Sequence, residues 1–263
     1  MSFICLDKVN CRRDGICMEV CPGGVITADA EGYPVMKDGA EAFCNKCGHC
    51  VAACATGALS HERLPMIDFL PNRKLRPGTA AEVEPLMLGR RSVRAYKDKP
   101  VEHALLERVL EVARRAPTAV NSQQVGWIMV EDPAKTRRLA ELGMEWMRGA
   151  GIFPRYVELW DKGREVFLRG APHVAVAHAP ADYTWGAVDC AIALTYMELV
   201  AAAHGLGACW AGLLTRAASA HARVAEALEL PQGRTVHGAL MLGWPKYRYS
   251  LVPPRNAANV AWL

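Results

Sequence analysis

Eight of the ten cysteines in this 263-residue chain fall within the first 54 residues, and most of them are regularly spaced. One set follows the pattern C-x2-C-x2-C-x3-C and consists of Cys44, Cys47, Cys50 and Cys54. The segment 33 residues earlier repeats the pattern with cysteines at three of the four positions, Cys11, Cys17 and Cys21. Three thiolates at intervals of three residues can hold the corners of one iron–sulfur cubane, while a fourth beyond a helical turn points away toward another.

The first copy of the repeat lacks one cysteine, because Asp14 stands at the position that matches Cys47. Seven cysteines and one carboxylate would supply the eight ligands of two four-iron clusters, with the oxygen ligand the weaker match to iron in a sulfide cluster. The alternative is that Asp14 is a turn residue before Gly15 and never touches iron.

Cys5 could substitute as a ligand, but core packing in a short strand over residues 3–6 is the simpler prediction. A structural zinc site at two C-x2-C pairs is a further alternative, but zinc sites rarely use three cysteines in a C-x2-C-x2-C series.

A disulfide scaffold would require an oxidising compartment, so cysteine ligation of metal in the cytoplasm is the favoured explanation. The composition, 51% hydrophobic and 22% charged with a net charge of +4, is that of a packed protein. No block of like charges supports a nucleic-acid partner. The most apolar stretch, residues 187–214, is interrupted by Asp189, Glu198 and His204, which argues against a membrane span. Cys190 and Cys209 lie in apolar surroundings and are expected to be buried.

The cysteine repeat resembles the bacterial two-cluster ferredoxin family, and in that family the ligands cross between the two copies. The resemblance implies one [4Fe–4S] cluster held by Cys21, Cys44, Cys47 and Cys50. It implies a second cluster held by Cys11, Cys17 and Cys54 with Asp14. The second site would be [4Fe–4S] when the iron at Asp14 is retained and [3Fe–4S] when this labile iron is lost.

The pattern of prolines and apolar residues divides the chain into a cluster domain (1–64), an extended connector (65–83) and a larger domain (84–263). Hydrophobic periodicity in the larger domain predicts helices over 102–116 and 187–204 and strands over 126–130, 173–178 and 238–243. This order predicts an α+β fold, and without G-x-G-x-x-G or a P-loop it gives no support for a Rossmann or NTPase domain. The whole chain is expected to be α+β, with a ferredoxin-like two-cluster domain before the larger one.

The larger domain resembles the nitroreductase family of FMN proteins over residues 85–263. Four segments carry the resemblance: RRSVR (90–94), APTAVNSQ (116–123), HGLGACWAG (204–212) and GWPKYRY with PPR (243–255). The resemblance implies an FMN phosphate site made of Arg90, Arg91, Ser92, Arg94, Lys246 and Arg255. It implies that Pro117, Thr118, Ala119 and Asn121 approach the flavin across a homodimer interface. Ala211 and Gly212 would lie near the flavin N5.

Together the two resemblances imply an enzyme, an FMN- and iron–sulfur-dependent oxidoreductase. Electrons would pass from the clusters to FMN and on to a small organic acceptor such as a nitroaromatic, quinone or enone. A separate ferredoxin or reductase would be the donor, and segment 141–169 would select the acceptor unless its aromatic residues are only core. One alternative is an NAD(P)H-dependent flavin reductase or dehydrogenase that exports electrons through the clusters. Another is a non-catalytic electron carrier or redox sensor.

Overall fold

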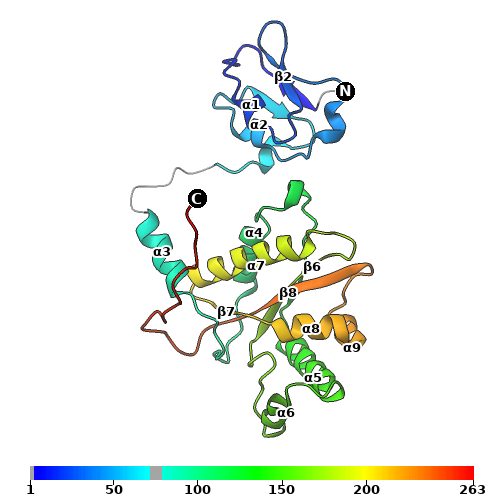
Figure 1. Ribbon diagram of the computed structural model, residues 1–263, viewed down its shortest axis with the longest axis vertical. Helices are drawn as coiled ribbons and strands as arrows, with labels where there is room; N and C mark the ends of the chain where they lie inside the picture. The colour runs from blue at the N-terminus through cyan, green and yellow to red at the C-terminus, as the bar shows by residue number, and fades with distance from the viewer. Residues whose placement is uncertain (1–2, 72–78) are drawn as a thin grey trace. The chain divides into compact units, whose positions relative to one another are not determined.

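The computed structural model describes residues 3–71 and 79–263, which form two compact units. The first unit contains residues 1–75 with 120–122, and the second contains 76–119 with 123–263. Figure 1 draws the first unit in blue and cyan and most of the second in green to red. The basic stretch 72–78 of the expected connector lies outside the described residues.

The first unit is built from very short elements around the cysteines. Strand β1 pairs with β4 and β2 pairs with β3, both antiparallel. The elements are β1 (Ile4–Leu6), α1 (Ile16–Glu19), β2 (Ile26–Ala28), β3 (Pro34–Met36), η1 (Ala40–Phe43), α2 (His49–Ala52), β4 (Leu59–His61) and η2 (Met66–Asp68). Each helix follows a glycine with positive φ, Gly15 (77°) before α1 and Gly48 (72°) before α2. Only glycine adopts this conformation without strain, so both copies of the repeat turn in the same way.

Ile4, Val25, Ile26 and Leu59 form the small apolar core of this unit, and cysteines pack against it. Because this core is so small, much of the stability of the unit must come from the group that the cysteines bind. The prediction that Cys5 packs in the core is wrong, because its side chain is exposed. Side chains alternate along a strand, so the burial of Ile4 directs its neighbour outward.

The second unit has a four-stranded antiparallel sheet with strand order β5-β6-β8-β7. Its elements are α3 (Thr79–Gly89), α4 (His103–Ala113), η3 (Ala119–Asn121, of which Val120 and Asn121 are grouped with the first unit), β5 (Gly126–Val130), α5 (Pro133–Gly149), α6 (Pro154–Asp161), β6 (His173–Pro180), α7 (Gly186–Ala203), β7 (Gly207–Trp210), α8 (Gly212–Ala220), α9 (Ala222–Ala227) and β8 (Arg234–Gly243). Helix α3 begins inside the stretch expected to be an extended connector. The two central strands, β6 and β8, have almost fully buried side chains, as expected for a sheet covered on both faces.

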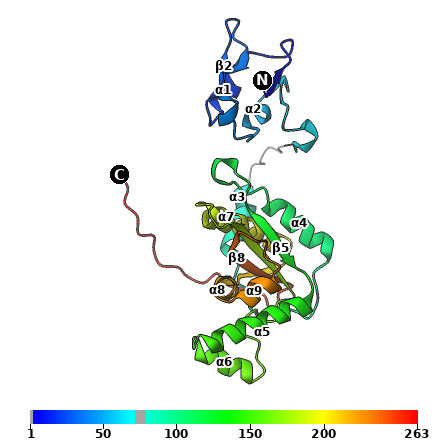
Figure 2. The same ribbon diagram turned by 90° about the vertical axis from the view of Figure 1, so that its right-hand side faces the viewer.

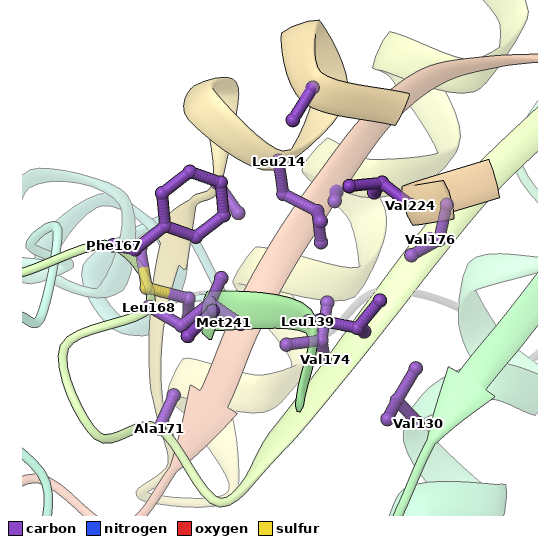
Figure 3. Packing of buried hydrophobic residues seen from close by; sticks show 14 of the residues in the cluster. Val130, Leu139, Phe167, Leu168, Ala171, Val174, Val176, Leu214, Val224 and Met241 are labelled. Atoms are coloured by element: carbon purple, nitrogen blue, oxygen red, sulfur yellow. The ribbon is translucent and has the colours of Figure 1, made fainter. Parts of the chain in front are cut away.

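Helices cover both faces of this sheet (Figures 1 and 2). On one face α4 and α7 bury Val109, Cys190 and Leu194 against Ala175 and Leu240. On the other face the buried side chains come from α5, α8, α9 and the strands. Figure 3 shows that cluster, in which Leu139, Leu214 and Val224 surround the strand residues Val174, Val176 and Met241.

Helix α7 is, among residues 3–71 and 79–263, the one helix long and apolar enough to cross a membrane, with a hydropathy of 1.5 over its 18 residues. The core helix of a folded domain meets the same criteria. Cys190, Leu194 and Met197 are fully buried, and Asp189 and Glu198 are buried and hydrogen-bonded. The position of α7 against the sheet therefore explains its apolar composition.

Candidate functional site

The cysteines of the first unit line two separate cavities. The first cavity is lined by Cys21, Cys44, Cys47 and Cys50. The second is lined by Cys11, Asp14, Cys17 and Cys54. Each cavity therefore takes three members from one copy of the repeat and one from the other, which is the grouping that the resemblance to two-cluster ferredoxins implies.

The donor chemistry of the two cavities fits iron–sulfur clusters. Within the described residues, the two cavities included, no three His, Cys, Asp or Glu side chains lie close enough together to bind a single metal ion. A cubane is larger than one ion and holds its ligands farther apart, so four sulfur donors around the first cavity, and three with a carboxylate around the second, suit a cluster better than zinc.

The thiols in each cavity influence one another electrostatically. Burial and, to a smaller extent, the nearby Cys21, Cys47 and Cys44 raise the pKa of Cys50 to about 11, against a backbone hydrogen bond from Val51 that lowers it. In the second cavity burial raises the pKa of Cys17, as do Asp14, Cys11 and Cys54. Gathering four such groups is unfavourable without a cation, because each thiolate raises the cost of ionising the next.

Asp14 forms a turn hydrogen bond and also lines the second cavity, and its role as an iron ligand stays a prediction. Its Oδ1 accepts the backbone N–H of Ile16 at 3.2 Å, which is the hydrogen bond of a turn residue. The same side chain lines the second cavity with Cys11, Cys17 and Cys54. A carboxylate has two oxygens, so the turn bond leaves Oδ2 for another partner.

Two side chains that the sequence did not single out lie against cysteine sulfurs. The Nε2 of His61 is 3.5 Å from the Sγ of Cys44, and the Oγ1 of Thr56 is 3.7 Å from the Sγ of Cys54. Burial raises the pKa of Cys54, but Thr56 and neighbouring backbone N–H groups outweigh burial and lower it overall. The only sequence signal for either residue is a position shortly after the last cysteine of the repeat.

In the second unit, three of the four flavin-related segments lie side by side at the β7 edge of the sheet. The backbone N–H of Val93 donates to Ala208 O at 2.9 Å, so the RRSVR run lies along β7. The backbone N–H of Lys246 donates to Ala95 O at 3.0 Å, which adds the start of the C-terminal segment. Gly207 allows this approach, because a Cβ there would lie 2.7 Å from the Cγ1 of Val93.

The three arginines of the RRSVR run have different partners. Arg90 forms an ion pair of 2.7 Å with the buried Glu198 of α7. Arg91 donates an Nη2 hydrogen bond to Leu88 O, while its Nε is buried and has no partner in the described part of the chain. Arg94 is exposed, and its Nη1 is 3.4 Å from Ser92 O. An unpartnered buried donor on Arg91 and the exposed guanidinium of Arg94, which has donors beyond its one hydrogen bond to Ser92 O, fit a bound phosphate.

The APTAVNSQ loop follows α4 and is tied to α7. The backbone N–H of Ala119 donates to both carboxylate oxygens of Asp189, at 3.1 and 3.3 Å, so it is already used within the chain. The hydroxyl of Thr118 accepts the backbone N–H of Gln123 at 3.0 Å, and the preceding Pro117 is exposed. Val120 has a φ of 48°, an unfavourable conformation for a β-branched residue that is found mostly at functional loops. Asn121 (φ 55°) groups with Val120 in the first unit.

The remaining predicted flavin residues differ in burial. Ala211 is 2% exposed and donates its backbone N–H to Ala239 O at 2.8 Å. Gly212 begins α8, and a Cβ at this position would meet open space. Lys246 and Arg255 are exposed, and Arg255 forms no ion pair with any described residue. Figure 2 shows the segment after Gly243 leaving the sheet without further helix or strand.

A cavity of about 490 Å³ in the second unit lies elsewhere. It is lined by Lys97, Lys99, Trp160 and Leu168 among others, and by none of the residues expected to hold FMN. We therefore do not assign the flavin to it. Within the described chain, the residues expected at the flavin follow the β7 edge and the loop after α4.

Comparison with known proteins identifies both parts of the chain. Residues 87–244 match the nitroreductase family and residues 9–59 match a 4Fe-4S dicluster domain. The FMN reductase [NAD(P)H] of Bacillus subtilis is 28% identical over 68% of this chain and 72% of its own length. The NADH dehydrogenase of Thermus thermophilus is 30% identical over 60% of this chain and 84% of its own length.

The structures agree with the sequence matches. A nitroreductase from Bacteroides fragilis, solved with bound FMN, superposes with a TM-score of 0.57 at 26% identity, over 69% of this chain and 98% of that one. The matched fold, the arrangement at the β7 edge and the two cysteine-lined cavities agree with one another. The chain belongs to the nitroreductase family and is an FMN- and iron–sulfur-dependent oxidoreductase of that type.

Proposed function

We propose that this protein passes electrons from two iron–sulfur clusters to FMN and on to a small organic acceptor, such as a nitroaromatic, quinone or enone. The observation that carries the proposal is the pair of cysteine-lined cavities in a chain whose larger unit is a nitroreductase. Bound FMN would supply the exchange between single electrons and hydride pairs that such a route needs. We place this activity in the cytoplasm, where thiols stay reduced.

The two cavities support the following ligand sets for the clusters. Cys21, Cys44, Cys47 and Cys50 would hold one [4Fe–4S] cluster. Cys11, Cys17 and Cys54 would hold the other with Asp14, as [4Fe–4S] or [3Fe–4S]. Each set lies around a single cavity, which supports these assignments.

The FMN phosphate would be held by Arg91, Ser92 and Arg94, with Arg255 and Lys246 from the C-terminal segment. Arg90 would contribute mainly through its ion pair with Glu198, which fixes the run against α7. Near the reactive part of the flavin, Ala211 and Gly212 would shape the site at the start of α8. Pro117, Thr118, Ala119 and Asn121 would complete it from the loop.

A homodimer would bring these parts together. Arg255 lies in an exposed segment that also carries Leu251 (81% exposed) and Trp262 (92% exposed). Apolar side chains so exposed on one chain suit a surface of a second copy. The partner's copy of the loop after α4 would then reach the flavin site, and a separate ferredoxin or reductase would load the clusters.

A second candidate function is favoured by the relatives, which are named as an NAD(P)H-dependent FMN reductase and an NADH dehydrogenase. In that case NAD(P)H would reduce the flavin directly and the clusters would export electrons. The residues that bind FMN would be the same, and the direction of electron flow would be reversed.

The test compares full-length protein with a variant that lacks the clusters. Cys47→Ser combined with Cys17→Ser removes one ligand from each cavity, and the exposed Cys5→Ser is the matched control. We expect turnover of a nitroaromatic by the wild type and the control with a reduced ferredoxin as donor. The double variant should keep FMN and lose at least about 99% of that turnover, because the electrons lose their route.

NADH provides the opposing result. If NADH reduces FMN in the double variant as fast as in the wild type, and ferredoxin drives no turnover in either, the second candidate function is correct. The order in which the cluster and flavin absorbances change in the wild type then gives the direction of electron flow.

A further inference from the structure

We propose that His61 and Thr56 are positioning residues that each donate one hydrogen bond to a cysteine sulfur and thereby set the reduction potentials of the two clusters independently. His61 acts on the cluster held by Cys44, and Thr56 acts on the cluster held by Cys54. The inference rests on the cluster ligands proposed above.

The contacts of His61 fix the position of its proton. Its Nδ1 accepts the backbone N–H of Arg63 at 3.1 Å, so this nitrogen carries a lone pair. A neutral imidazole then has its proton on Nε2, the atom 3.5 Å from the Sγ of Cys44. The contact is therefore an N–H···S hydrogen bond from His61 to the sulfur.

The imidazole ring is held in this orientation from several sides. His61 is 4% exposed and ends β4, where it pairs with Ile4 of β1. The ring of Phe3 lies 5.8 Å from it, centroid to centroid, and the guanidinium of Arg63 lies 3.8 Å from the centre of the Phe3 ring. A donor fixed in advance by packing loses little entropy when it forms its hydrogen bond.

Thr56 holds the corresponding place in the second cavity. Its Oγ1 is 3.7 Å from the Sγ of Cys54, and a cysteine bound to a cluster has no proton to give. The hydroxyl must then be the donor. The two donors are not copies of each other in the repeat, because Cys44 is the first cysteine of its run and Cys54 is the last.

Reduction adds negative charge to a cluster and its sulfur ligands. A hydrogen bond to sulfur stabilises the reduced form more than the oxidised form and so raises the potential. Removing the donor should therefore make the potential of that cluster more negative. Because each donor touches a sulfur of one cavity only, the effect should stay within one cluster.

The test is a redox titration of the full-length holoprotein followed by electron paramagnetic resonance, with iron analysis of every sample. His61→Phe should lower the potential of the Cys44 cluster by about tenfold in the one-electron equilibrium constant, or about 59 mV. Thr56→Val should lower the potential of the Cys54 cluster and leave the other unchanged. His61→Gln, which retains an N–H donor, should recover most of the shift.

Wild-type potentials for both clusters in His61→Phe and Thr56→Val, at full iron content, would overturn the inference. Equal shifts of both clusters in either variant would also overturn it, since they would indicate a general change in the unit. If His61→Phe fails to assemble its cluster, the potential of the Cys54 cluster in Thr56→Val tests the inference by itself, because that substitution removes only a hydroxyl. Wild-type protein reconstituted with fewer than two clusters would instead refute the proposed ligand sets.

Discussion

Asp14 lines the second cavity with one carboxylate oxygen already used, because its Oδ1 accepts the N–H of Ile16. If Oδ2 binds the fourth iron, that iron is the most weakly held of the eight, since a carboxylate is a poorer match than a thiolate. Mild oxidation of the native protein should therefore give one [3Fe–4S] signal per chain in electron paramagnetic resonance. The cluster at Cys44 should stay intact.

Two substitutions make the Asp14 prediction specific. Asp14→Cys should suppress the three-iron signal, and Asp14→Ala should leave it dominant even after anaerobic reconstitution. Two oxidation-resistant four-iron clusters in the native protein, with no change of spectrum or iron count in Asp14→Ala, would show that Asp14 is only a turn residue. The exposed Cys5 or an external ligand would then have to complete the site.

His178 gives the second unit a pH-dependent stability. Burial, followed by the charge of Arg234 and by His237, lowers the pKa of His178 from 6.5 to about 4, and its Nδ1 accepts the Nε–H of Arg234 at 2.5 Å. An unfolded histidine binds a proton below about 6.5, whereas the folded one stays neutral down to about 4. Protonation thus favours unfolding, and the free energy of unfolding should fall by about 1–2 kcal/mol as the pH drops through this range.

His178→Asn keeps an acceptor near the Nδ1 position and cannot titrate. Its free energy of unfolding, from denaturant titrations between pH 7.5 and about 5, should depend less on pH than that of the wild type. Parallel curves for the two proteins would mean that His178 is not the source. Comparing the two cancels the contribution of the other titrating groups.

At the scale of elements, hydrophobic periodicity predicted α4, α7, β5, β6 and β8 in the second unit, whereas bounds for α5, α6, α8 and α9 were not predicted. Strand β5 has the expected bounds, and α7 is displaced by one residue at each end. Strand β8 begins four residues before the expected Gly238, since its polar first residues hide the alternation. The crossed cysteine sets were implied by the resemblance to two-cluster ferredoxins, and their role as ligands stays a prediction.

Long-range partners could not be predicted in the same way. The ion pair of Arg90 with Glu198 joins residues 108 apart in the sequence, and the anchor of Ala119 on Asp189 joins residues 70 apart. Only the tertiary fold brings such groups together. The available signal was indirect: two carboxylates in an otherwise apolar helix must be paired if they are buried.

The contact of the RRSVR run with β7 depends on Gly207. Gly207→Ala would place a Cβ 2.7 Å from Val93, so the run must shift away from the strand. We expect a loss of stability of about 1–3 kcal/mol and weaker FMN retention in gel filtration. Gly149→Ala, where a Cβ meets nothing within 4 Å, is the matched control and should be neutral or slightly stabilising. Normal flavin content in Gly207→Ala would indicate that the RRSVR run does not form the FMN phosphate site.

Substitutions of Arg94 and Arg90, which belong to the same run, should affect different properties, FMN binding in one case and stability in the other. Arg94→Ala removes an exposed charge and should weaken FMN binding about ten- to a hundredfold with little change in melting temperature. Arg90→Ala leaves Glu198 buried without its partner and should cost about 3–5 kcal/mol of stability. Fluorescence titration with FMN and thermal unfolding measure the two effects. Unchanged affinity in Arg94→Ala would place the phosphate elsewhere.

At the scale of the whole molecule, the exposed C-terminal segment predicts a flavin-loaded homodimer. Deleting residues 247–263 should yield a monomer in sedimentation experiments and remove most of the FMN, because the apolar side chains and Arg255 are lost together. Arg255→Ala is the control, and it should weaken FMN binding without dissociating the dimer. A native monomer that retains flavin would contradict the prediction.

Helix α7 also matters before the protein is complete. Strand β8, against which α7 packs, begins about 30 residues after the helix ends. The ribosome therefore synthesises this strand a few seconds after the helix. In that interval it is an apolar segment of membrane-spanning length. Asp189 and Glu198 oppose its insertion, since a carboxylate in a transmembrane helix costs up to about 3.5 kcal/mol. The two residues that anchor a loop and an arginine in the folded enzyme would thus also oppose insertion of the nascent helix into a lipid bilayer.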